Sequence, residues 1–171
     1  MSDELLYRAR AFAVEAHGGQ RYGDKPYIYH LDQVAGLVES YGNDAQIIGY
    51  LHDVVEDTPV DRLEVAEVFG HFVGACVEIV TDEPGRTREE RKRKTNQKMR
   101  RVSGSHELAL VVKAADRLAN VTVCLTEQDS KRLDMYLREQ AIFRSAVYRR
   151  GLCDEIWSRL SECLREPLNK S

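Results

Sequence analysis

Apolar side chains recur along most of the chain at steps of three and four residues, the spacing of an amphipathic α-helix. The first such segment runs from Leu5 to Ala16, and Gly18 and Gly19 are predicted to end it. Residues 22–29 contain a glycine and a proline and are predicted to form a loop. Further helices are predicted over residues 30–41, 44–57, 63–69, 73–80, 86–101, 108–125, 135–148 and 155–164. Strand signals are scarce, so the pattern predicts an all-α domain of about eight or nine helices.

Two helix boundaries have a local signal. Asp44 stands where a side chain can cap the helix that follows it. Thr58 precedes Pro59, and a residue before proline avoids the α conformation, so the same helix is predicted to end there.

Length and composition are those of one ordinary soluble domain. The chain has 171 residues, of which 43% are hydrophobic and 31% charged, and this balance argues against disorder. No apolar run reaches the roughly 20 residues that a membrane helix needs, and the polar N-terminus is unlike a secretory signal. The four cysteines form no C-x-x-C pair and are expected to be reduced. We therefore expect a cytoplasmic protein; the sequence does not indicate an oligomeric state.

The charge is small overall but unevenly placed. The net charge of −3 argues against nucleic acid as a partner, yet residues 86–101 hold nine basic and two acidic side chains. This basic stretch has two interpretations. It forms a solvated helix face, or it supplies a positive field for a phosphorylated ligand or nucleic acid.

The segment LHDVVEDT, residues 51–58, contains the densest group of reactive side chains. On a helix, Asp53, Glu56 and Asp57 project to one side, and His52 lies next to Glu56. Three carboxylates so close would repel one another unless a cation neutralises them. The alternative is an exposed acidic helix end, but apolar residues bracket the group in the middle of the chain. The segment therefore favours a metal site.

Two further ligands are predicted from distant segments. Asp116 is the sole carboxylate in the apolar run 108–123, where an unpaired charge is costly. Its neighbour Arg117 does not face it on a helix, so Asp116 is interpreted as a metal ligand. His30 begins a helix after a proline-containing loop and can point inward, although an ordinary core histidine would fit the same position. Two histidines and two aspartates suit Mn²⁺, Fe²⁺, Co²⁺ or Zn²⁺. Glu56 and Asp57 lie close enough to orient an attacking water.

The order of these residues resembles the HD-domain phosphohydrolases. More narrowly, it is similar to the hydrolase domain of RelA/SpoT-type enzymes and to the small alarmone hydrolases. The matching segments within residues 9–125 are AVEAHGGQR at 13–21, PYIYH at 26–30, LHDVVEDT at 51–58, EIVTD at 78–82 and KAADRLANV at 113–121. The resemblance implies a single HD-domain helical bundle over residues 1–171, in which residues 126–171 form C-terminal helices.

The resemblance also implies a reaction and a set of roles. The reaction is removal of the 3′-pyrophosphate from ppGpp or pppGpp, which gives GDP or GTP and pyrophosphate. The implied manganese ligands are His30, His52, Asp53 and Asp116, and the implied catalytic pair is Glu56 and Asp57. Arg21 would lie near the metal and the phosphates, Tyr27 near the base or ribose, and Lys113 and Asn120 along the substrate.

Three positions depart from the family pattern, and all lie around the expected substrate pocket. Tyr22 follows the loop arginine where a second basic residue is usual, Leu31 stands in place of a proline, and Ala119 replaces a larger residue. These departures leave two alternatives open. The chain hydrolyses another nucleotide or phosphoester, or it is a non-enzymatic regulatory or nucleic-acid-binding domain with a structural metal. The presence of both Glu56 and Asp57 argues for an enzyme.

Overall fold

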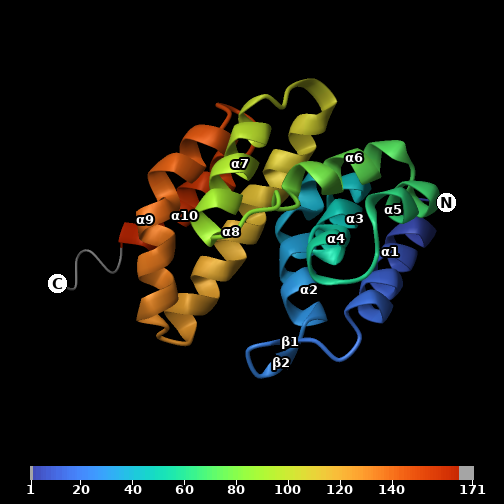
Figure 1. Ribbon diagram of the computed structural model, residues 1–171, viewed down its shortest axis with the longest axis horizontal. Coiled ribbons are helices and arrows are strands. Elements are labelled where there is room, and N and C mark those ends of the chain that lie inside the picture. Colours follow the sequence, from blue (N-terminus) through green and yellow to red (C-terminus); the bar gives the residue numbers. More distant parts are fainter. Residues whose placement is uncertain (1, 166–171) are drawn as a thin grey trace.

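The helical architecture is seen in a computed structural model, which describes residues 2–165 (Figure 1). In chain order the elements are α1 (Ser2–His17), β1 (Arg21–Tyr22), β2 (Lys25–Pro26), α2 (Ile28–Leu37), α3 (Asn43–Leu51), α4 (Val54–Asp57), α5 (Arg62–Phe69), α6 (His71–Val80), α7 (Arg88–Arg100), α8 (Leu108–Thr126), α9 (Ser130–Val147) and α10 (Asp154–Arg165). Short 3₁₀ turns occupy Glu39–Tyr41 and Gly104–Glu107. The predicted all-α class is confirmed, because within the described residues the only strands are one two-residue pair.

Helix α8 runs through the middle of the fold. It packs against α2, α3 and α6 on one side and against α9 and α10 on the other (Figure 1). Its buried side chains include Leu110, Val111 and Leu118. This burial explains why the segment reads as nearly continuous apolar sequence, since a helix surrounded on several sides has little polar face. The central position also brings Asp116 within reach of elements from the first third of the chain.

The segment predicted as one helix over residues 44–57 is broken in the structure. Helix α3 ends at Leu51, a turn follows at His52 and Asp53, and α4 is a single turn that ends before Thr58. The expected end before Pro59 is confirmed by the extended backbone of Thr58. The expected cap at Asp44 is wrong. The N-cap is Gly42, and Asp44 lies in the first helical turn, where its charge faces the positive end of the helix dipole.

The predicted loop over residues 22–29 is more ordered than expected. Strands β1 and β2 pair antiparallel, with Arg21 opposite Pro26 and Tyr22 opposite Lys25. Helix α2 begins at Ile28, so His30 lies in its first turn.

Helices α2 and α3 approach closely at Gly49. A Cβ atom on Gly49 would lie 3.1 Å from the Cα atom of Ala35, a tighter contact than nearly all side chains make, so glycine suits this close crossing. All four cysteines are free thiols, of which Cys163 is half-buried and the other three are buried. Among the described residues, no helix is both long enough and apolar enough to cross a membrane.

Candidate active site

The four predicted metal ligands meet where α2, the α3–α4 turn and α8 converge. The Oδ2 atom of Asp53 lies 3.1 Å from Nε2 of His52 and 3.7 Å from Nε2 of His30. The Oδ1 atom of Asp116 lies 3.3 Å from Nε2 of His30 and 3.7 Å from Nε2 of His52. Both imidazoles are buried. The carboxylates of Asp53 and Asp116 therefore both lie beside the Nε2 atoms of His30 and His52.

The arrangement around His52 fits a metal ion. Its Nδ1 atom donates a hydrogen bond of 2.7 Å to the carbonyl of Gly49, which leaves the lone pair on Nε2. That Nε2 atom is buried and has no hydrogen-bond partner among the described residues. Donor atoms of His30, His52 and Asp53 all lie within 4.8 Å of one another. The imidazole and carboxylate donors are those of first-row divalent ions, so the residues fit such an ion.

The charges at this centre depend strongly on one another. Burial lowers the pKa of His52, but Asp53 and Asp116 outweigh burial and raise it to about 10. Burial raises the pKa of Asp53, but the facing His52 more than offsets this effect and the pKa ends below its usual range. Asp116 shows the same balance, with Lys113 as the main cation that lowers its pKa. The two carboxylates thus stabilise a proton on His52, and a bound cation would replace that proton.

Glu56 and Asp57 differ from the two ligand carboxylates. Desolvation raises the pKa of both, and the charge of Asp53 raises that of Asp57 further. The Oε2 atom of Glu56 accepts a hydrogen bond of 3.1 Å from the backbone N–H of Asp82. Both side chains line a cavity of about 210 Å³ next to the ligands, which we call the metal cavity. A carboxylate with a raised pKa in such a place is suited to proton transfer.

Tyr27 contacts the carboxylates directly. Its hydroxyl lies 2.7 Å from Oδ2 of Asp53 and 3.0 Å from Oδ2 of Asp57, and it can donate to either. Its ring stacks on His17, with centroids 4.3 Å apart. The tyrosine also lines the metal cavity, so its expected contact with a base or ribose stays a prediction.

Lys113 and Asn120 surround Asp116 from within α8. The ammonium group of Lys113 lies 3.4 Å from Oδ2 of Asp116. The amide of Asn120 donates a hydrogen bond of 2.5 Å to Oδ1 of Asp116 and accepts one of 2.8 Å from the Tyr22 hydroxyl. Both residues line the metal cavity, and their contact with a substrate stays a prediction.

Arg21 lies away from these residues. Its side chain is exposed and donates to the backbone carbonyl of Asp24, and it is not among the residues that line the metal cavity. Neighbouring residues of a strand point to opposite sides, so only one of Arg21 and Tyr22 can face inward. Tyr22 does so, and its ring stacks on His30 with centroids 4.7 Å apart. The expected role of Arg21 at the phosphates stays a prediction.

Tyr22 was expected around the substrate pocket and lines the metal cavity, but several other cavity residues were not predicted individually from the sequence. These residues are Arg88 and Lys92 of α7, Arg117 of α8 and Tyr136 of α9. Arg88 and Lys92 are four residues apart and so share a helix face, which the spacing within the basic stretch could have indicated. Arg117 and Tyr136 carry no local signal, because their position depends on how α8 and α9 pack.

The family model described as "HD domain" matches residues 9–152. The chain belongs to the HD-domain family. This HD domain is 31% identical over 163 residues to a guanosine-3′,5′-bis(diphosphate) 3′-pyrophosphohydrolase of Aquifex aeolicus, and the match covers 93% of this chain and 23% of that protein. It is 31% identical over 160 residues to the GTP pyrophosphokinase rsh of Brucella ovis, with 90% of this chain and 21% of that protein covered. The HD domain thus spans about a fifth of the length of these long relatives.

A shorter relative and a solved structure match more completely. The guanosine-3′,5′-bis(diphosphate) 3′-pyrophosphohydrolase MESH1 of Danio rerio is 35% identical over 127 residues, which cover 70% of this chain and 69% of that protein. A solved structure described as a metazoan ortholog of SpoT that hydrolyzes ppGpp superposes with a TM-score of 0.82 at 25% identity, over 95% of both chains. These matches confirm the resemblance drawn from the motifs.

Proposed function

We propose that this HD domain is a metal-dependent phosphohydrolase that removes the 3′-pyrophosphate of ppGpp and pppGpp. The observation that carries the proposal is the shared cavity. It holds ligand carboxylates with lowered pKa values beside Glu56 and Asp57, whose pKa values are raised. A structural metal site has no need of the second pair. Groups with such different proton affinities in one cavity are typical of acid–base catalysis.

His30, His52, Asp53 and Asp116 would hold the ion. Among the candidates Mn²⁺, Fe²⁺, Co²⁺ and Zn²⁺ we propose Mn²⁺, on the family resemblance and the mixed nitrogen and oxygen donors. A divalent ion supplies Lewis acidity, which polarises a phosphoryl group and lowers the pKa of water.

Glu56 and Asp57 would handle the proton of the attacking water. The backbone N–H of Asp82 orients Glu56, and the hydroxyl of Tyr27 orients Asp57. In the reaction, the water oxygen forms a bond to phosphorus while the bond from phosphorus to the ribose 3′ oxygen breaks. The water proton passes to one carboxylate of this pair, and the pair returns a proton to the departing ribose 3′ oxygen. The products are pyrophosphate and GDP or GTP.

The cations of the metal cavity would bind the substrate phosphates. Arg88, Lys92, Lys113 and Arg117 all line it, although Arg21 does not. The basic stretch therefore contributes through Arg88 and Lys92. Lys94, by contrast, pairs with Glu90 at 2.8 Å. A nucleotide substrate is further supported by the relatives named for (p)ppGpp hydrolysis.

A second candidate is hydrolysis of another phosphorylated nucleotide by the same centre. One observation favours it: the Tyr22 hydroxyl donates a hydrogen bond to the amide oxygen of Asn120, while its ring stacks on His30. A tyrosine where a basic residue is usual changes the shape and charge of the pocket and leaves the proposed catalytic pair in place.

A substrate panel separates these candidates. Purified protein is incubated with ppGpp, pppGpp, NADPH and common nucleotides in the presence of Mn²⁺, and the products are identified by chromatography. We expect pyrophosphate release from ppGpp and pppGpp. Asp53→Ala, measured alongside, should lose bound Mn²⁺ and activity together because a ligand is removed. Turnover of a different nucleotide alone would support the second candidate, and no turnover of any would contradict an enzyme.

A further inference from the structure

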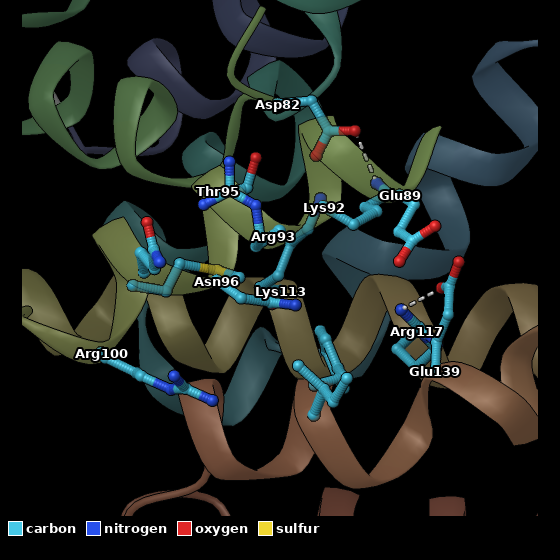
Figure 2. Close-up of a pocket in the computed structure, with 14 residues that line it drawn as sticks. Asp82, Glu89, Lys92, Arg93, Thr95, Asn96, Arg100, Lys113, Arg117 and Glu139 are labelled. Carbon is cyan, nitrogen blue, oxygen red and sulfur yellow. Dashed lines mark hydrogen bonds and ion pairs between the residues drawn. The ribbon is translucent and has the colours of Figure 1, made fainter. Parts of the chain in front are cut away.

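Three cations form a wall between two cavities. Lys92, Lys113 and Arg117 line the metal cavity and also a second cavity of about 210 Å³ enclosed by α7, α8 and α9 (Figure 2). Glu139 of α9 lines the second cavity but not the metal cavity, whereas Arg88 lines only the metal cavity. Glu139 therefore stands behind the wall, on the side away from the metal ligands.

The carboxylate of Glu139 joins two arginines of the metal cavity. Its Oε1 atom lies 2.8 Å from Nε of Arg88, and its Oε2 atom lies 3.2 Å from Nη2 of the same residue. Oε2 also lies 3.2 Å from Nη2 of Arg117 (Figure 2). The side-on contact uses the Nε edge of Arg88 and so fixes the plane of its guanidinium group.

The two arginines need this partner for different reasons. The Arg117 side chain is only 7% exposed, and its guanidinium carbon lies 4.2 Å and 4.7 Å from the ring centroids of Phe143 and Tyr136. Without Glu139 it would be a buried charge with no ion pair within 4.0 Å among the described residues. The Arg88 side chain is 40% exposed and would be free to leave the cavity. The pKa of Glu139 supports the contact: burial raises it, but the two arginines lower it below its usual range.

We propose that Glu139 is a positioning residue for substrate phosphate. It holds Arg88 and Arg117 so that their remaining N–H groups face the metal cavity, and it makes no contact with the substrate itself. This inference rests on the proposed function, because it requires a phosphorylated substrate in the metal cavity.

The proposal predicts that removing the Glu139 carboxylate raises KM, whereas a simple charge effect would lower KM. Removing a negative charge close to an anion site makes the local potential more positive and should strengthen phosphate binding. Removing a positioning group frees the arginines and should weaken it. The direction of the change in KM therefore distinguishes the two roles.

The test compares Glu139→Gln with the matched variant Glu89→Gln. Glu89 of α7 lines the same second cavity and has no ion pair among the described residues. For Glu139→Gln we expect KM to rise about 10-fold, as for loss of oriented charged hydrogen bonds, with kcat and bound Mn²⁺ nearly unchanged. Glu89→Gln should leave KM unchanged or slightly lower. A fall in KM for Glu139→Gln, or no change, would overturn the proposal.

Two further variants keep the test valid if Glu139→Gln folds poorly. Glu139→Asp keeps the charge but shortens the side chain, so KM should still rise, whereas a charge-only role predicts the wild-type value. Because Glu139 contacts both Arg88 and Arg117, its removal should raise KM less in an Arg88→Gln background than in the wild-type protein, and an equal rise would contradict a role through Arg88. If the wild-type protein hydrolyses no nucleotide, the proposed function fails. The same variants are then compared for binding of inorganic pyrophosphate, where weaker binding by Glu139→Gln but not by Glu89→Gln supports the positioning role, and equal binding contradicts it.

Discussion

Four carboxylates that line one cavity differ in how tightly they hold a proton. Asp53 and Asp116 face imidazoles and Lys113, and their pKa values are lowered. Glu56 and Asp57 stand at the cavity wall, and their pKa values are raised mainly by desolvation. The first pair is thus suited to hold a cation and the second to accept a proton. The motif predicted which side chains gather here, but the division of roles comes from their surroundings.

At this scale we predict the effect of Glu56→Gln. The amide keeps the shape of the side chain but cannot accept the proton, so turnover should fall about 10²- to 10⁴-fold. Bound metal, measured by elemental analysis of the purified variant, should stay at the wild-type level because Glu56 is not a ligand. Near-normal turnover would show that another group accepts the proton.

At the scale of elements, the break between α3 and α4 shapes the centre. In a continuous helix, adjacent side chains diverge by about 100°, so His52 and Asp53 would not face a common point. The turn at these two residues lets both do so, and the carbonyl of Gly49 holds the His52 ring in place. The sequence pattern could not show the break, because the apolar spacing continues through it.

The crossing of α2 and α3 yields a prediction with an internal control. Gly49→Ala would place a Cβ atom 3.1 Å from the Cα atom of Ala35, so α2, which carries His30, and α3, which precedes His52, would have to shift by a few tenths of an ångström. We expect a loss of about 1–3 kcal/mol in the free energy of unfolding and weaker Mn²⁺ binding. Gly36→Ala on α2 meets nothing within 4 Å and should be neutral or stabilising by up to about 1 kcal/mol. Denaturant unfolding and metal titration measure both effects, and equal metal affinity in the two variants would contradict the role of the crossing.

At the scale of the whole molecule, the sequence predicted more of the metal centre than of the arginines and the glutamate beside it. His52 and Asp53 stand out because charged groups interrupt an apolar segment, and Asp116 stands out for the same reason. Arg88 and Glu139 do not, since charged residues on α7 and α9 are ordinary for surface helices. The contact between the arginines and Glu139 depends on the tertiary packing of α7, α8 and α9. Arg21 shows the opposite case: the motif places it at the site, but the geometry of its strand turns its side chain outward.

The centre also connects parts of the chain that are far apart in sequence. The proposed ligands come from α2, the α3–α4 turn and α8, so one ion would join three elements of the bundle. An ion that binds only the folded state stabilises it by about 2.7 kcal/mol at a concentration 100 times its Kd. For a chain of this size that corresponds to a rise in Tm of roughly 5–10 °C. Chelation should reverse the rise in the wild-type protein and have little effect on Asp53→Ala; an unchanged Tm would argue against a site that joins these helices.

The melting temperature then becomes a reporter of site occupancy. Because the shift depends on the affinity of the folded protein for each ion, titrating Mn²⁺, Fe²⁺, Co²⁺ and Zn²⁺ against Tm would rank them without any assay of hydrolysis. The preferred metal can thus be determined before the substrate is known.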